Sequence, residues 1–259
     1  MRLLFAIGVF GSVTFVLSAV HIPVVVAMVA AAFISVAAGF SPPDGGLKAA
    51  APLAIAAIPI VVLAINMSIV PLHDFDGRAF WLLKAKAIAH EHAIDGPFFH
   101  GQVVHAPRNQ YPLLMPIDAA ALMLVSGSID DSHARLLYLL TFVAFIWIIA
   151  TRVSPWCAAI LAWLPQFAVA GEGGALSAYS DIAFAAFVAC AFMEIIDGDS
   201  PIRFGCWLAF LVLTKSEGLP VALILFGIGL SRRWWRAAIP LAIAIAALLT
   251  WRARIPRRC

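Results

Sequence analysis

Charged residues are scarce in this chain of 259 residues: Lys, Arg, Asp and Glu make up 12%, and hydrophobic residues make up 63%. Soluble domains carry about a quarter charged and about half apolar residues, so this composition excludes a soluble globular domain. The apolar runs are long and unbroken, whereas the strands of a membrane barrel alternate in short segments. The predicted fold class is therefore all-α, a polytopic bundle of transmembrane helices.

Cysteine and net charge are also low, and each excludes a class of function. The cysteines show no paired spacing, and three of the four lie in apolar segments, so we predict neither a disulfide nor a zinc site. A net charge of +3 is too small to indicate a nucleic-acid partner. The histidines of the most polar stretch match no compact set of metal ligands, and we predict that they bind no metal: His73, His90, His92, His100 and His105.

The apolar pattern divides the chain into three parts. Residues 1 to 70 contain apolar runs over about 3 to 20, 22 to 40 and 50 to 70, each near the length that crosses a bilayer. Residues 71 to 133 are predicted to form an external loop with juxtamembrane helices. Residues 134 to 259 are predicted to hold the remaining transmembrane helices, with crossings over about 134 to 150 and 155 to 170 and a short hairpin at 204 to 230.

The positive charges predict which segments share a side of the membrane. If Arg2 and Lys48 lie inside, the loop that begins at residue 71 faces outside. The apolar segment at 112 to 127 would cover only about 24 Å as a helix, so we predict a re-entrant or surface helix there. Asp181 then faces the same side as the loop. The tip of the hairpin, with Lys215 and Glu217, is predicted to lie at membrane depth, where charge is costly unless it has a task or the two charges neutralise each other.

The stretch from residue 71 to residue 112 gathers most of the chemistry. It includes Asp74, Asp76 and Lys84, and its apolar side predicts a helix from about residue 77 to residue 93. Steps of four residues from Asp76 reach Lys84, so the two would share a face with Trp81 beside them, where the lysine could hold a phosphate oxygen. Helix capping by the aspartates and ordinary anchoring of Trp and Lys at a lipid interface remain alternatives.

Four motifs in order resemble one enzyme family. They are DFDGRAFW followed by KAK (74 to 86), YPLLMP (111 to 116), YSDIAF (179 to 184) and LTKSEGLP (213 to 220). Together they resemble the GT-C membrane glycosyltransferases, in particular bacterial proteins similar to protein mannosyltransferases, lipid A aminoarabinose transferase and the Rgt-type lipopolysaccharide galacturonosyltransferases. The resemblance covers about residues 70 to 230, and it implies a GT-C-like bundle with an external catalytic loop.

The resemblance implies roles for particular residues. Asp76 would be the catalytic acid of the first external loop, with Asp74 second, and Lys215 would join Lys84 as a contact of the donor phosphate. Asp181, Glu217, Trp81 and Tyr111 would support the site. No cofactor is certain, and a divalent cation held by Asp76 and Asp181 with phosphate oxygens is left open.

The resemblance also implies a reaction, partners and a location. A polyprenyl-phosphate sugar would donate its sugar to a glycan, lipid or protein acceptor on the outer face of the membrane. The location would be the inner (cell) membrane of a bacterium, multi-pass, with the site facing the periplasm or exterior as part of cell-envelope synthesis. Such relatives are longer, so we expect a shortened member or a subunit that needs another chain. A membrane transporter and a truncated, non-catalytic membrane protein are the alternatives.

Overall fold

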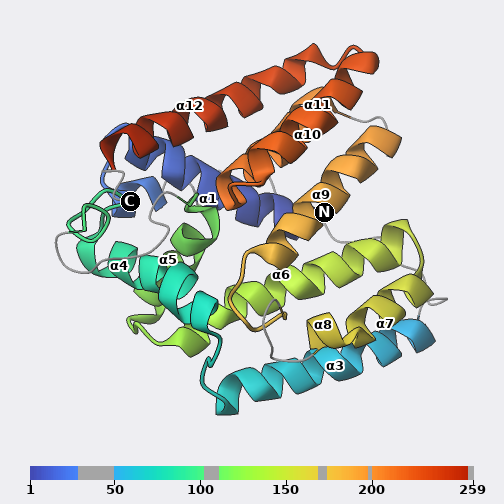
Figure 1. Ribbon diagram of the computed structural model, residues 1–259. Helices are drawn as coiled ribbons and strands as arrows, with labels where there is room; N and C mark the ends of the chain where they lie inside the picture. The colour runs from blue at the N-terminus through green and yellow to red at the C-terminus, as the bar shows by residue number, and fades with distance from the viewer. Residues whose placement is uncertain (29–49, 102–110, 169–173, 198–199, 256–259) are drawn as a thin grey trace.

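The computed structural model describes residues 1–28, 50–101, 111–168, 174–197 and 200–255, and the regular elements among them are all helices (Figure 1). The predicted apolar run from 22 to 40 lies largely outside the described residues. The helices are α1 (Arg2–Ala19), α3 (Ala50–Ile69), η2 (Gly77–Leu82), α4 (Leu83–Glu91), α5 (Leu114–Ser126), α6 (Asp131–Arg152), α7 (Pro155–Trp163), α8 (Pro165–Ala168), α9 (Asp181–Asp197), α10 (Pro201–Thr214), α11 (Gly218–Ser231), η3 (Trp235–Ala237) and α12 (Ala238–Arg254).

Three helices of the described chain are long and apolar enough to cross a membrane: Ala51–Ile69, Asp131–Arg152 and Trp235–Arg254. The first and last expose most of their apolar surface, whereas α6 is mainly buried inside the protein. Such broad apolar surfaces are unfavourable in water, and lipid is the solvent that suits them. The predicted all-helical fold is therefore confirmed for the described residues, and three of its helices have the length and composition of membrane spans.

The helices form two groups that share α6. On one side of α6, α3 packs against α6 and α7. On the other side, α9 and α10 pack together, and α10 also contacts α11 and α12 (Figure 1). The first helix, α1, packs against α5, α10 and α12. Helices α1 and α3, which the sequence places in one N-terminal part, thus share α6 as a neighbour but otherwise pack against different helices.

The bundle has two ends with different residues. One end, here called the loop end, contains the segments after α3 and before α6 and α9, the α10–α11 turn and the C-terminal end of α12, toward the left of Figure 1. The other end, the arginine end, contains the turns after α6, α9 and α11. Its arginines are Arg152, Arg203, Arg232, Arg233 and Arg236. The up-and-down course of the helices therefore separates the candidate site residues from this arginine cluster.

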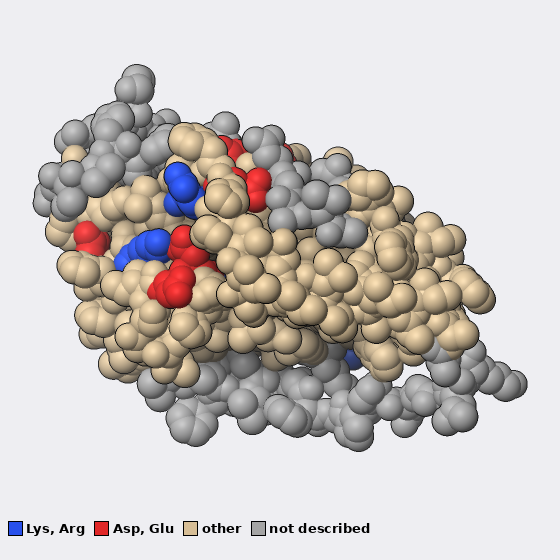
Figure 2. Space-filling view, turned by 90° about the horizontal axis from the view of Figure 1, so that it is seen from below, with Lys and Arg blue, Asp and Glu red and all other residues tan. Residues whose placement is uncertain are grey.

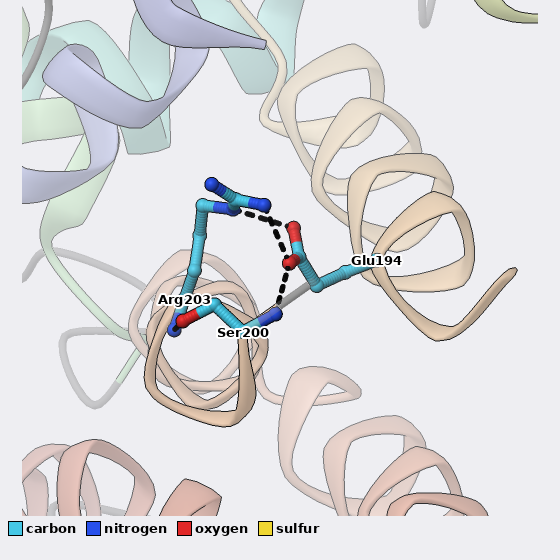
Figure 3. Close-up of polar contacts among 3 residues, drawn as sticks. All are labelled: Glu194, Ser200 and Arg203. Carbon is cyan, nitrogen blue, oxygen red and sulfur yellow. Dashed lines mark hydrogen bonds and ion pairs between the residues drawn. The ribbon is translucent and has the colours of Figure 1, made fainter. Parts of the chain in front are cut away.

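An ion pair closes the α9–α10 turn at the arginine end (Figure 3). The carboxylate of Glu194 is 1% exposed and accepts hydrogen bonds from Arg203 Nε at 2.7 Å and Nη2 at 2.8 Å. The backbone N–H of Ser200 donates to the same carboxylate at 3.0 Å. Paired, parallel hydrogen bonds of this kind fix both distance and orientation. The pair thus sets the angle at which α10 returns toward the loop end.

Replacing Glu194 by glutamine is expected to lower the free energy of unfolding by about 1 to 3 kcal/mol, because a buried charge-assisted contact is lost. The lower part of that range is expected, since the Arg203 side chain is 40% exposed and water can solvate it. The loss can be measured as the temperature at which buried Cys190 becomes reactive to a maleimide. The matched change of exposed Glu217 to glutamine should shift that temperature little, and an equal shift in both variants would contradict a role for the ion pair.

One predicted element differs from the structure. The single crossing predicted over 155 to 170 is wrong: α7 has 9 residues and ends at Trp163, and α8 is a separate turn. Pro165 explains the break, because proline has no N–H to donate and disfavours helical geometry in the residue before it. The segment predicted as a re-entrant or surface helix is α5, whose 13 residues are too short for a full crossing.

Candidate functional site

The helix that carries Asp76 contains a π-helical segment near its start. The N–H of Arg78 donates to the carbonyl of Asp74 at 3.1 Å, and η2 then runs over Gly77–Leu82, where the N–H of Leu83 reaches back to the carbonyl of Arg78. Asp76 stands at the N-cap position, but its side chain makes no capping hydrogen bond. The capping alternative for Asp76 is therefore wrong.

The π-helix also changes which side chains share a face. A continuous α-helix over 77 to 93 is wrong for its first turns, and the α-helical part ends at Glu91, where His92 is left-handed. Each π turn holds an extra residue, so steps of four no longer connect Asp76 to Lys84. Short π segments are frequent at functional sites, where they aim side chains that an α-helix would turn away.

Lys84 lies inside the protein beside two aromatic rings. Lys84 is 1% exposed, and its Nζ atom lies 5.8 Å from the centroid of the Trp81 ring and 5.5 Å from the centroid of the Tyr111 ring. Trp81 is buried as well, and its ring lies 6.1 Å from Tyr111. Cation–π attraction is strongest for a desolvated ammonium. Lys84, Trp81 and Tyr111 thus form one internal cluster, in which Lys84 is less accessible to a phosphate than Lys215.

Arg135 joins the two loops that carry the aspartates, and sequence reasoning missed it. This buried side chain donates from Nη1 to the carbonyl of Val70 at 2.6 Å and from Nε to the carbonyl of Leu176 at 3.2 Å. Asp131 and Asp74 interact with it electrostatically. The sequence feature that indicates its role is an arginine near the start of an otherwise apolar helix, where burying a charge costs free energy.

Gly77 brings the same two loops into direct contact. A Cβ atom on Gly77 would overlap the carbonyl oxygen of Ser177, so only glycine allows this approach. The Ser177 hydroxyl is buried and donates to the carbonyl of Gly174 at 2.7 Å, which holds the second loop in a tight turn. The loop after α3 and the loop before α9 are therefore one packed unit.

Asp181 and Lys215 form an ion pair at the loop end. Nζ of Lys215 lies 2.7 Å from Oδ1 of Asp181, and the side chains are 18% and 48% exposed. Asp181 is the first residue of α9, and Lys215 follows the last residue of α10. Glu217 is exposed at the N-cap position of α11 without a capping hydrogen bond. The tip of the α10–α11 hairpin thus lies beside the N-terminal end of α9, at the loop end of the bundle.

The last turn of α12 adds two arginines that sequence reasoning did not assign. Nη2 of Arg252 lies 3.5 Å from the hydroxyl of Ser216, next to Lys215. Nη1 of Arg254 lies 3.6 Å from Oδ2 of Asp95. Arginines in the last turn of a helix that is predicted to end outside depart from the positive-inside rule, and that departure is their signal in the sequence.

Charged side chains of both signs gather at the loop end. Viewed from below, they occupy the left of the molecule, and the broad surface on the right is almost without charge (Figure 2). A further pair there joins Lys86 to Asp131 at 2.7 Å. Asp130 caps α6 by accepting from the N–H of Ser132 at 3.1 Å, and this hydrogen bond lowers the pKa of the Asp130 carboxyl.

The described residues do not form a metal cage. Within the described ranges, no three His, Cys, Asp or Glu side chains lie together as ligands. One oxygen of Asp181, a residue left open as a ligand, already accepts from Lys215. The arrangement can instead supply a carboxylate as a base and an ammonium as a phosphate contact.

Replacing Gly77 by alanine is expected to separate the two loops, with a loss of about 1 to 3 kcal/mol in stability, the usual range for overpacking. The matched change is Gly227→Ala in α11, where an added Cβ meets nothing within 4 Å. That variant should gain about 0.5 to 1 kcal/mol, because alanine is the better helix former. The temperature at which buried Cys190 becomes reactive to a maleimide reports the stability of both variants. Equal unfolding temperatures would contradict the close packing of the loops.

Comparisons with protein-family models, with curated proteins and with solved structures give no match.

Proposed function

We propose that this protein is a membrane glycosyltransferase that moves a sugar from a polyprenyl-phosphate donor to a hydroxyl of a glycan, lipid or protein acceptor. The observation that carries the proposal is the 2.7 Å pair of Asp181 and Lys215 at the same end as the Asp74 to Lys84 segment. These residues come from separate parts of the chain, and each belongs to one of the motifs that resemble the GT-C family. The Lys215 ammonium, which the Asp181 carboxylate holds in place, suits a phosphate leaving group. The carboxylates of Asp74 and Asp76 at the same end of the bundle suit a hydroxyl acceptor.

The proposed step makes one bond and breaks one bond. The acceptor hydroxyl oxygen bonds to C1 of the sugar, and the bond between C1 and the phosphate oxygen breaks, which releases polyprenyl phosphate. Asp76 takes the acceptor proton as general base. Lys215 stabilises the negative charge that grows on the leaving phosphate, and Asp181 holds the ammonium in position.

The proposed arrangement in the membrane is based on the two ends of the bundle. The arginine end would face the cytoplasm and the loop end the exterior or periplasm, with Arg252 and Arg254 as departures from the positive-inside rule. A lipid-linked donor would then enter at the outer leaflet. The inner membrane of a bacterium is the proposed location, as the resemblance implies.

The direct test is release of polyprenyl phosphate from a lipid-linked sugar by the purified protein in liposomes. Lys215→Ala is expected to raise KM for the donor about tenfold, the effect of losing one charge-assisted hydrogen bond of about 1.5 kcal/mol. Lys215→Arg keeps the charge and should retain most of the affinity. A donor KM that is unchanged in Lys215→Ala would remove this residue from phosphate binding.

A transporter is the second candidate, and Asp118 is the observation that favours it. This residue of α5 is 4% exposed, and neither of its carboxylate oxygens has a hydrogen-bond partner. It lies against Gly11 of α1, and the hydroxyl of Tyr138 nearby is also unpartnered. Buried acids within membrane helices often mark ion pathways. Flux of a polar solute into proteoliposomes without release of polyprenyl phosphate would establish the transporter.

A further inference from the structure

The turn between α11 and α12 carries a cluster of exposed arginines at the arginine end, away from the candidate site (Figure 1). Its sequence is SRRWWR, residues 231 to 236, and Arg232, Arg233, Trp235 and Arg236 are all exposed. The candidate membrane span that follows begins at Trp235. The cluster therefore lies where the chain would enter a bilayer, at the depth of the lipid headgroups.

Packing against α10 holds this turn in one shape. The rings of Trp234 and buried Phe204 meet edge to face, with their centroids 5.4 Å apart. Gly229 lies so close to the same Phe204 ring that an added Cβ would overlap it. Gly205 of α10 approaches the backbone of Ala237 just as closely. The arginines thus extend from a turn whose position is fixed, so binding a ligand requires little ordering of the backbone.

Arg233 occupies a backbone position that usually belongs to glycine. Its φ is 60°, in the left-handed region, and the N–H of Trp234 donates back to the carbonyl of Gly229 at 3.1 Å. This hydrogen bond is typical of a helix C-terminus that is closed by a left-handed residue, where glycine avoids strain. An arginine in this conformation costs free energy that glycine would not, which indicates that its side chain has a task.

Two of the guanidinium groups lie over tryptophan rings. Cζ of Arg232 is 5.9 Å from the centroid of the Trp234 ring, and Cζ of Arg236 is 5.4 Å from the centroid of the Trp235 ring. Cation–π attraction of this kind orients the guanidinium groups, but a ring supplies no negative charge to neutralise them. The cluster therefore presents oriented positive charge to a ligand.

The charges of the cluster select one class of lipid headgroup. Among the side chains that the structure describes at this end, the one acidic group is Glu194, which is buried and already paired with Arg203. A zwitterionic headgroup would find guanidinium partners for its phosphate but no described carboxylate for its ammonium. An anionic headgroup has a phosphate and no ammonium, so it matches the cluster in charge and can accept paired hydrogen bonds from a guanidinium.

Apolar side chains next to the cluster suit the acyl chains of the same lipid. Ile228 and Leu230 near the end of α11 are 41% and 47% exposed, and Ile239 near the start of α12 is 53% exposed. Each lies within about one helical turn of an arginine of the cluster. A phospholipid at this position would place its headgroup on the arginines and its tails along α11 and α12.

We propose that Arg232, Arg233 and Arg236 form a binding surface for the headgroup of an anionic phospholipid. The guanidinium groups bind the phosphate oxygens, and the exposed apolar side chains of α11 and α12 contact the acyl chains. The surface lies at the opposite end of the bundle from the residues proposed for sugar transfer, so the two proposals do not depend on each other.

The test is native mass spectrometry of the purified protein in detergent, which counts bound lipid molecules. The probes are phosphatidylglycerol and phosphatidylcholine with the same acyl chains, added together at equal concentration. The wild type is expected to retain phosphatidylglycerol in preference. Arg233→Gln should lower that preference about fivefold, the usual effect of one cation at a membrane surface. Replacing all three arginines by lysine keeps the charge and should keep most of the preference.

Two control variants locate the lipid on this surface. Arg78→Gln removes an exposed arginine from the loop end and should leave the preference unchanged. Lys215→Ala removes the proposed phosphate contact and should also leave it unchanged, which separates this surface from the sugar-transfer site. Equal retention of the two lipids by the wild type would overturn the proposal. A preference that falls as much in either control as in Arg233→Gln would overturn it as well.

Discussion

Replacing Asp76 by asparagine is expected to abolish sugar transfer while the protein still folds and inserts into the membrane. Asparagine keeps the shape of the side chain but cannot take a proton from the acceptor hydroxyl. Loss of a general base lowers kcat by about 10²- to 10⁴-fold. The Asp76 side chain makes no capping hydrogen bond to η2, so the change removes no cap from this helix. The measurement is release of polyprenyl phosphate by each variant in liposomes.

The matched control is Asp130→Asn. Asp130 is an exposed carboxylate of the same loop end, whereas Asp76 is half-buried, and asparagine caps a helix about as well as aspartate does. This variant should keep its rate of transfer. Unchanged turnover in Asp76→Asn, with normal insertion, would remove Asp76 from the mechanism and leave Asp74 as the remaining acid of that loop.

Replacing Arg135 by methionine is expected to have the largest effect on the structure of the site. The change removes hydrogen bonds to the carbonyls of Val70 and Leu176 and leaves Asp131 and Asp74 without the positive charge between them. Breaking a buried charged contact costs about 3 to 5 kcal/mol, and methionine fills the volume without replacing the donors. We expect a fall in the unfolding temperature, read by maleimide reaction of Cys190, together with loss of transfer.

Arg152 provides the comparison for Arg135. It lies at the other end of α6 and is exposed. Arg152→Met should change stability by no more than about 0.5 kcal/mol, as is usual for surface positions. If both variants unfold at the same temperature, the two loops do not depend on Arg135.

The apolar pattern of the sequence predicts most helices well because their length is set by where charge and turn residues begin. The run from 50 to 70 corresponds to α3, and the crossing predicted over 134 to 150 lies within α6. Hydropathy alone does not predict the break after Trp163, because Pro165 is as apolar as its neighbours. The break comes from the N–H that Pro165 lacks.

The candidate site was harder to predict because its contacts join distant parts of the chain. Arg135 binds carbonyls 65 and 41 residues away, and a backbone carbonyl leaves no mark in the sequence. The pair of Asp181 and Lys215 spans 34 residues. Their motifs and predicted sidedness placed them at one end, but no local pattern specifies a 2.7 Å contact. The π-helix at Asp76 also has no sequence signature of its own, so the predicted face was wrong.

The most direct test of the account asks whether the candidate site residues open on one side of the membrane. With all native cysteines replaced by serine, single cysteines are placed at exposed positions as Arg78→Cys, Glu217→Cys and Arg233→Cys. A membrane-impermeant maleimide added to intact cells is predicted to label the first two, and Arg233→Cys only after the membrane is opened. Labelling of Arg78→Cys and Glu217→Cys from opposite sides would contradict the shared site and the sugar transfer proposed for it.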